Sequence, residues 1–139
     1  MDIADVKKKV LRTIERARHN AAERRARADT TARAYEAFLE RTAVPVCRQV
    51  SNVLRAEGYV FDVFTPPGSV RLMSERTTDD YIDLVLETSG DQPVVTCRTI
   101  RRRGNRTLQT ETIVGDPETL GEQDVLTFVL KALEPFVER

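Results

Sequence analysis

The sequence contains no tryptophan, one histidine, two cysteines and six glycines in 139 residues. No stretch approaches the roughly 20 consecutive apolar residues of a membrane-spanning helix. No basic segment followed by a short apolar core marks a secretory signal peptide. We therefore expect a cytoplasmic protein with no membrane insertion. Apolar side chains make up 40% of the chain, which is enough for one domain, or for one domain plus an extension.

Catalytic and ligand-binding motifs are also absent. The sequence has no GxGxxG, GxxxxGK[ST], HExxH or GxSxG pattern, which excludes the best-known nucleotide, zinc and serine-hydrolase signatures. His19 has no recognisable partner at metal-ligand or general-base spacing. Cys47 and Cys97 lack CxxC spacing, which favours two buried free thiols over a disulfide or redox pair. The sequence thus predicts no enzymatic activity, no cofactor and no metal.

The net charge of zero conceals an asymmetry between the two parts of the chain. Residues 1–57 hold 13 Lys or Arg against 8 Asp or Glu, whereas residues 58–139 hold 9 against 14. Most of the positive excess lies between Lys7 and Arg33. One interpretation is a solvated basic helix face. The alternatives are an anionic partner for this segment or head-to-tail attraction between subunits.

Residues 1–57 have the apolar period of one long helix. At about 100° per residue, thirteen apolar or small residues fall within roughly 40° of one direction. They are Ile3, Val6, Val10, Ile14, Ala17, Ala21, Ala28, Ala32, Tyr35, Leu39, Val46, Val50 and Val53. His19 lies opposite this stripe and is expected to be exposed. The mean spacing is close to 3.6 residues, so the pattern permits a coiled coil without requiring one.

A straight helix of this length creates a conflict with the size of the chain. It would span about 80 Å, whereas a compact domain of this size is only about 35 to 40 Å across. Pro45 is the main candidate for a kink or a break, although the stripe keeps its phase across it. A weaker candidate is the capping-box-like pair Asn20 and Glu23. We predict an extended helical arm over residues 1–43 and an α+β domain over residues 44–139.

The stripe is weakest in its middle. Between Ala17 and Ala34 the inward positions are almost all alanine, which favours helix formation and close approach but contributes little apolar area. We expect this segment to be solvated or to pack against another helix, and the richer N-terminal and C-terminal ends to be buried. The predicted interaction surface is formed by Val10, Ile14, Ala17, Ala21, Ala28 and Ala32.

After Gly58, a well-placed helix C′ residue, the apolar period changes from 3.6 to 2. The pattern predicts strands over residues 59–65, 69–75, 81–88, 92–103 and 106–114, with a helix over residues 45–57 before them and one over residues 122–137 after them. The short connections require antiparallel pairing. The predicted fold is α+β, with a five-stranded meander and the C-terminal helix packed on one face of the sheet.

Gly104 and Asn105 predict a two-residue hairpin turn between the last two strands. In that register Arg103 lies opposite Arg106, Arg98 opposite Glu111, and Val95 opposite Val114. The Arg98–Glu111 match is a favourable cross-strand pair and supports the register.

Two charged clusters are candidate sites. Asp79, Asp80, Asp83 and Glu87 can be interpreted as a site for a hard cation or as an outward polar face with Asp83 and Glu87 outside. Arg98, Arg101, Arg102, Arg103 and Arg106 can contact polyanions through bidentate guanidinium groups, or can be a solvated or subunit-facing hairpin. The absence of interleaved aromatics and a pI near 6.6 weigh against nucleic-acid binding.

The architecture favours a non-enzymatic protein-interaction or assembly module: an adaptor, a chaperone-like protein or an oligomeric subunit. Its partner would be a second copy or another protein, bound through the N-terminal helix. The alternative is a nucleic-acid or polyanion-associated protein that uses the basic helix and the Arg101–Arg106 hairpin tip.

Overall fold

The computed structural model describes residues 1–77, 79–90 and 92–138 and has the predicted α+β class. Its backbone forms two compact units, Met1–Ala32 and Arg33–Arg139. The elements in chain order are α1 (Ile3–Phe38), the π-helical turn η1 (Leu39–Ala43), α2 (Val44–Ala56), β1 (Phe61–Phe64), β2 (Ser69–Ser74), β3 (Tyr81–Glu87), β4 (Val94–Arg103), β5 (Arg106–Gly115) and α3 (Glu122–Val137).

The helical run from Ile3 to Ala56 has no interruption at either candidate break. Asn20 and Glu23 lie inside α1. Pro45 lies in the first turn of α2, and the wider turn of η1 directly precedes it. This irregular turn accommodates the proline, which clashes with the preceding turn of a regular helix. Of the two alternatives that the sequence leaves open at Pro45, a kink or a break, the structure shows no break. Gly58 ends the run with φ +91°, as expected for a C′ glycine.

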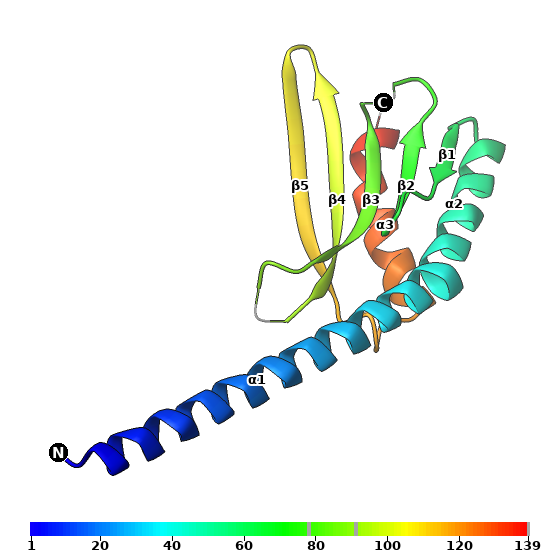
Figure 1. Ribbon diagram of the computed structural model, residues 1–139. Helices are drawn as coiled ribbons and strands as arrows, with labels where there is room; N and C mark the ends of the chain where they lie inside the picture. Colours follow the sequence, from blue (N-terminus) through cyan, green and yellow to red (C-terminus); the bar gives the residue numbers. More distant parts are fainter. Residues whose placement is uncertain (78, 91, 139) are drawn as a thin grey trace. The chain divides into compact units, whose positions relative to one another are not determined.

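The five strands form one antiparallel meander in the order β1-β2-β3-β4-β5 (Figure 1). The predicted hairpin register is confirmed at Arg103–Arg106 and Arg98–Glu111. It is wrong at Val95, which lies opposite Gly115 instead of Val114. A register shift between Val95 and Thr96 causes this difference, because a bulge inserts one unpaired residue into one strand.

One face of the sheet and the helices enclose the core of the second unit. Leu72, Ile82, Leu84 and Val95 on the strands are at most 2% exposed. They belong to one cluster with α2 and with Val125, Val129 and Leu133 of α3, the helix that lies behind the sheet in Figure 1. Phe61 and Phe136 pack edge to face with ring centroids 5.9 Å apart.

The C-terminal end of α1 belongs to this core. Tyr35 and Phe38 are buried and stack at 6.3 Å between ring centroids. The Tyr35 hydroxyl donates a hydrogen bond to the Gly68 carbonyl oxygen at 2.5 Å. Burial raises the pKa of this hydroxyl, and the charge of Asp83 raises it further. Residues 33–43, which the sequence places in the predicted arm, therefore contribute to the second unit.

Candidate interaction surfaces

The apolar stripe of the first unit is exposed in this structure. Exposed fractions are 85% for Ile3, 51% for Val10 and 39% for Ile14, and Val6 and Leu11 are similarly accessible. The prediction that the N-terminal end is buried is therefore wrong for this chain. Periodicity identifies the face of a helix that prefers an apolar environment, but it does not show that the same chain supplies a cover.

The alanine-rich middle of the predicted interaction surface is open as well. Ala17, Ala28 and Ala32 are exposed, and Ala21 is partly exposed. Together with Val10 and Ile14, these side chains form a helical stripe of exposed and partly exposed positions. The stripe changes from branched side chains near the N-terminus to methyl groups farther along.

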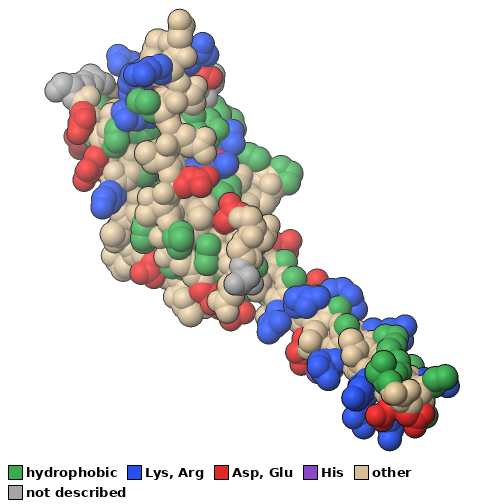
Figure 2. Space-filling view, turned by 90° about the vertical axis from the view of Figure 1, so that its left-hand side faces the viewer, with side chains coloured by type: hydrophobic (Ala, Val, Ile, Leu, Met, Phe, Trp, Pro, Cys, Tyr) green, Lys and Arg blue, Asp and Glu red, His purple; other side chains and the backbone are tan. Residues whose placement is uncertain are grey.

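The same helix carries a dense positive charge. Residues 7–27 contain nine Lys or Arg and two Glu, a net charge of +7. None of these nine side chains makes an ion pair with another described residue, whereas His19 Nε2 lies 3.0 Å from Glu23 Oε1. As predicted, His19 is exposed. Figure 2 shows basic and apolar side chains next to one another on this helix.

Asp83 is not an outward surface residue, which corrects the sequence interpretation. Asp83 lies between Ile82 and Leu84 on β3, and its side chain is completely buried. Arg98 donates from Nε to Oδ1 at 2.9 Å and from Nη2 to Oδ2 at 2.8 Å, and Arg71 Nη2 approaches Oδ2 at 3.4 Å. The sequence could not indicate this, because the two arginines come from β2 and β4, the two strands that flank β3.

A row of alternating charges crosses the sheet through this carboxylate. The register places Arg71, Asp83, Arg98 and Glu111 opposite one another on β2, β3, β4 and β5. The hydrogen bond to Asp83 raises the pKa of Arg98, and the Arg71 guanidinium lies 4.1 Å from the centroid of the Tyr81 ring. Arg98 thus has a structural partner inside the sheet, which reduces its availability to an external anion.

The predicted acidic and basic clusters largely neutralise each other. Arg102 Nη1 lies 3.3 Å from Asp79 Oδ2, and Arg103 Nη1 lies 3.4 Å from Asp80 Oδ2. The backbone N–H of Arg102 also donates to Asp80 Oδ1 at 2.9 Å. Within the described part of the chain, the hairpin arginines without an ion pair are Arg101 and Arg106.

The acidic cluster does not assemble as a cation site. No group of three or more His, Cys, Asp and Glu side chains among residues 1–77, 79–90 and 92–138 has metal-binding geometry. The fourth member of the predicted set, Glu87, accepts a hydrogen bond from the backbone of Ser89 at 2.9 Å. Hydrogen bonding with Ser89 lowers the pKa of Glu87, as stabilisation of a charged carboxylate does.

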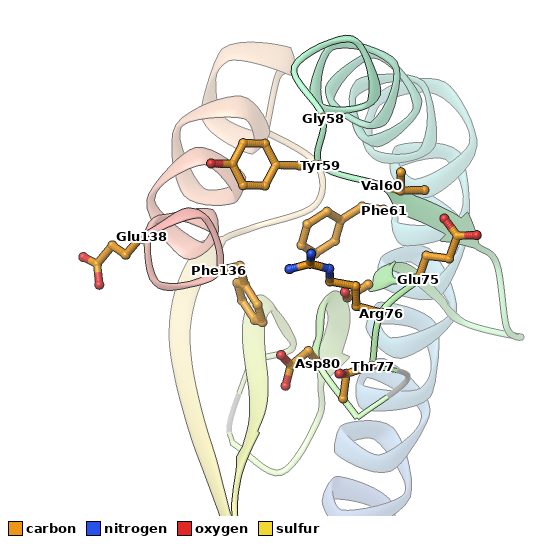
Figure 3. Close-up of a pocket in the computed structure, with 11 residues that line it drawn as sticks. Gly58, Tyr59, Val60, Phe61, Glu75, Arg76, Thr77, Asp80, Phe136 and Glu138 are labelled. Atoms are coloured by element: carbon orange, nitrogen blue, oxygen red, sulfur yellow. The ribbon is translucent and has the colours of Figure 1, made fainter.

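A cavity of about 690 Å³ lies in the second unit where α2 ends. Figure 3 shows Phe61, Phe136, the Arg76 guanidinium and the Asp80 carboxylate directed toward it, and Glu75 and Glu138 directed away. Asp80 is also the residue that holds the β4–β5 hairpin through Arg102 and Arg103. The other lining residues are Gly58, Tyr59, Val60, Ser74 and Thr77.

Cys47 and Cys97 are both buried and free, as the sequence predicts. Burial raises the pKa of each thiol to about 12, with smaller contributions from Cys97 at Cys47 and from Asp83 at Cys97. A thiol with such a pKa holds almost no thiolate at neutral pH, and the thiolate is the reactive form. Both side chains therefore act as small core residues.

No helix within the described residues combines the length and the hydropathy that crossing a bilayer requires. Comparisons with protein-family models, with curated proteins and with solved structures gave no match to this chain.

Proposed function

We propose that this chain is a non-enzymatic protein-interaction or assembly module that docks onto another chain through its N-terminal helix. The observation that supports this proposal is the exposure of Ile3, Val6, Val10, Leu11 and Ile14 along one side of α1. Contiguous exposed apolar side chains on a soluble surface are typical of interaction sites. An amphipathic helix with this spacing binds by placing its apolar side in a groove of its partner.

The charge of the helix specifies the chemistry of the partner. With a net charge of +7 over residues 7–27, two such helices placed side by side repel each other. A groove lined by Asp and Glu attracts the helix instead, and complementary charge accelerates its association. We therefore infer a second protein with an acidic groove in preference to pairing of this helix with its own copy.

Matched substitutions on opposite sides of α1 test the proposal. Ile14→Gln places a neutral polar group in the stripe, whereas His19→Gln makes the same kind of change on the opposite side. Tagged wild-type and variant chains are expressed in the native host, and co-purifying proteins are quantified by mass spectrometry. We expect one stoichiometric partner, reduced about tenfold or more by Ile14→Gln and unchanged by His19→Gln. Equal recovery with all three chains would contradict docking through the stripe.

A second candidate is association with nucleic acid or another polyanion through the basic helix. The nine unpaired Lys and Arg side chains of residues 7–27 favour it, and Arg101 and Arg106 at the hairpin add to it. The pairing of Arg98, Arg102 and Arg103 with aspartates reduces the support from the hairpin.

Salt dependence decides this second candidate. Fluorescence anisotropy with generic duplex and single-stranded DNA and RNA is measured between low and physiological salt. Phosphate contacts require the logarithm of affinity to fall linearly with the logarithm of salt concentration. Replacement of Lys8 and Arg12 by Gln would reduce that slope by about two. No binding at low salt would remove this candidate.

A further inference from the structure

The outer edge of β5 is the least protected part of the sheet. Among the described residues β5 pairs with β4 alone, so one side of its backbone has no strand beside it. An edge of this kind presents unpaired N–H and C=O groups, which favour pairing with another strand. Residues 106–113 of this strand are all exposed, including Leu108 at 39% and Ile113 at 66%.

The opposite edge of the sheet shows how this fold protects a strand. β1 has four residues, and the Ser51 hydroxyl of α2 donates a hydrogen bond to the carbonyl of its Phe61 at 2.5 Å. β5 has ten residues, no proline and no lysine. Its bulge lies at the end that pairs with Val95. Apart from the charges of Arg106 and Glu111, the usual protective features of an edge strand are therefore missing along most of β5.

We propose that the β5 edges of two copies of this chain pair antiparallel about a two-fold axis and join their sheets into one of ten strands. An antiparallel strand placed on its own copy is self-complementary, as a closed two-fold dimer requires. This inference is independent of the N-terminal helix and goes beyond the proposed function. A dimer of this kind would carry two docking helices, which increases avidity for a partner with two sites.

The register of the inferred dimer is determined by the length over which the two β5 strands overlap and by the charges that face each other. A two-fold axis perpendicular to the sheet passes beside one residue, which then lies opposite its own copy. Axes at Thr110 or at Glu111 give the longest overlap of residues 106–115. The axis at Glu111 places two identical carboxylates opposite each other, which is destabilising. The axis at Thr110 avoids this contact and is the register that we infer.

The cross-strand neighbours closest to the axis are compatible in this register. Gln109 lies opposite the partner's Glu111, Thr107 opposite the partner's Ile113, and Leu108 opposite the partner's Thr112. An amide and a carboxylate can form a hydrogen bond, and β-branched pairs stabilise sheets. The axis at Thr110 extends the alignment beyond the strand, so that the turn around Gly104 lies beside Asp116 of the partner subunit.

This alignment gives the arginine-rich end of the hairpin a partner. Arg106 has no ion pair with another described residue of its own chain. Asp116 and Glu118, which follow β5, are exposed and have no basic side chain in an ion pair in the described structure. In the inferred dimer, the arginine-rich turn of one copy and the Asp116–Glu118 segment of the other lie at the same end of the joined edges. The two-fold axis repeats this arrangement at the opposite end.

Cysteine cross-linking tests the register. Thr110→Cys places two thiols opposite each other at the axis, whereas Thr107→Cys and Glu111→Cys serve as controls on the same exposed strand. We expect mild oxidation to convert Thr110→Cys to a covalent dimer at least about tenfold faster than either control, because a disulfide requires Cα atoms within about 7 Å. Equal rates for all three, or faster reaction of Glu111→Cys, would overturn the inferred register.

Substitutions of opposite sign at one position test the dimer without cross-linking. Gln109→Lys places an amino group opposite the partner's Glu111, and Gln109→Glu places a carboxylate there. Since each contact occurs twice, we expect the dissociation constant from sedimentation velocity to fall roughly 3- to 10-fold for the first variant and to rise by a similar factor for the second. Tyrosine fluorescence confirms that both variants are folded.

A wild-type chain that stays monomeric at about 100 µM, or a dimer unaffected by either charge, would overturn the inference. Ile14→Gln tests whether dimerisation is independent of the N-terminal helix. If β5 forms the dimer, this helix variant dimerises like the wild type even though it loses its docking partner. Loss of the dimer in Ile14→Gln would assign dimerisation to the helix and contradict pairing through β5.

Discussion

Large apolar side chains are exposed in the first compact unit of this chain and form a buried core in the second. In residues 33–138 the core residues Leu84, Val125 and Val129 are at most 1% exposed. In residues 1–32 the largest apolar residues are all exposed by 39% or more. We therefore expect substitutions in the two units to have different effects. A change in the core should lower the free energy of unfolding, whereas a change in the N-terminal stripe should affect the proposed docking and leave stability nearly unchanged.

The largest expected effect is at the buried carboxylate. Asp83→Ala leaves Arg71 and Arg98 without their shared partner, and loss of one member of a buried charge group costs about 3–5 kcal/mol. The control is Asp62→Ala, which removes the exposed 3.1 Å pair with Arg55 and should cost about 1 kcal/mol or less. Urea unfolding followed by tyrosine fluorescence measures both. Equal costs would contradict a structural role for the buried row.

A pair of apolar truncations compares the two units directly. Leu84→Ala creates a cavity in the core and should lower the free energy of unfolding by about 2–5 kcal/mol. Ile14→Ala removes an exposed side chain and improves helix propensity, so the change should stay within about 0.5 kcal/mol. All three tyrosines lie in the second unit, so their fluorescence follows its unfolding. A cost above that range for Ile14→Ala would show that the stripe is covered within the chain.

A smaller effect is expected from the thiols at alkaline pH. Burial raises the folded-state pKa values of Cys47 and Cys97 to about 12. The unfolded chain therefore loses these protons first, and stability that is complete below about pH 9 is lost as pH rises toward 12. We expect a loss of about 1 kcal/mol per thiol at pH 10. The Cys47→Ala/Cys97→Ala double variant should lack this part of the loss and keep only the part due to Tyr35, whose pKa burial also raises. The same pH dependence in that variant would assign it to other groups.

Most of the fold can be predicted from the sequence because each helix, strand and turn depends mainly on residues that are close in sequence. Helix and strand periods, the C′ glycine at Gly58 and the two-residue turn at Gly104 each depend on a few neighbouring residues. The hairpin register is correct up to Thr96 and fails at Val95, where a bulge has no clear sequence signal. Pro45 illustrates the same limit, since its accommodation depends on the π-helical turn of Leu39–Ala43.

The sites were harder to predict because they depend on strand order. The sequence predicts Asp83 on an exposed face. Its burial depends on arginines of two neighbouring strands, which lie 12 and 15 residues away in sequence. The pairing of Arg102 and Arg103 with Asp79 and Asp80 joins two clusters that the sequence suggested separately. The exposure of the N-terminal stripe likewise depends on what surrounds the helix. The apolar period of the helix does not specify those surroundings.

The most direct test of helix docking is amide hydrogen exchange over residues 3–21, measured on the purified chain and on the complex isolated from the native host. Docking buries one side of the helix and suppresses its local opening, so we predict that exchange of these amides slows about tenfold or more in the complex. Unchanged exchange in this segment, with slowing confined to residues 33–138, would contradict the proposal that the N-terminal helix is the docking surface.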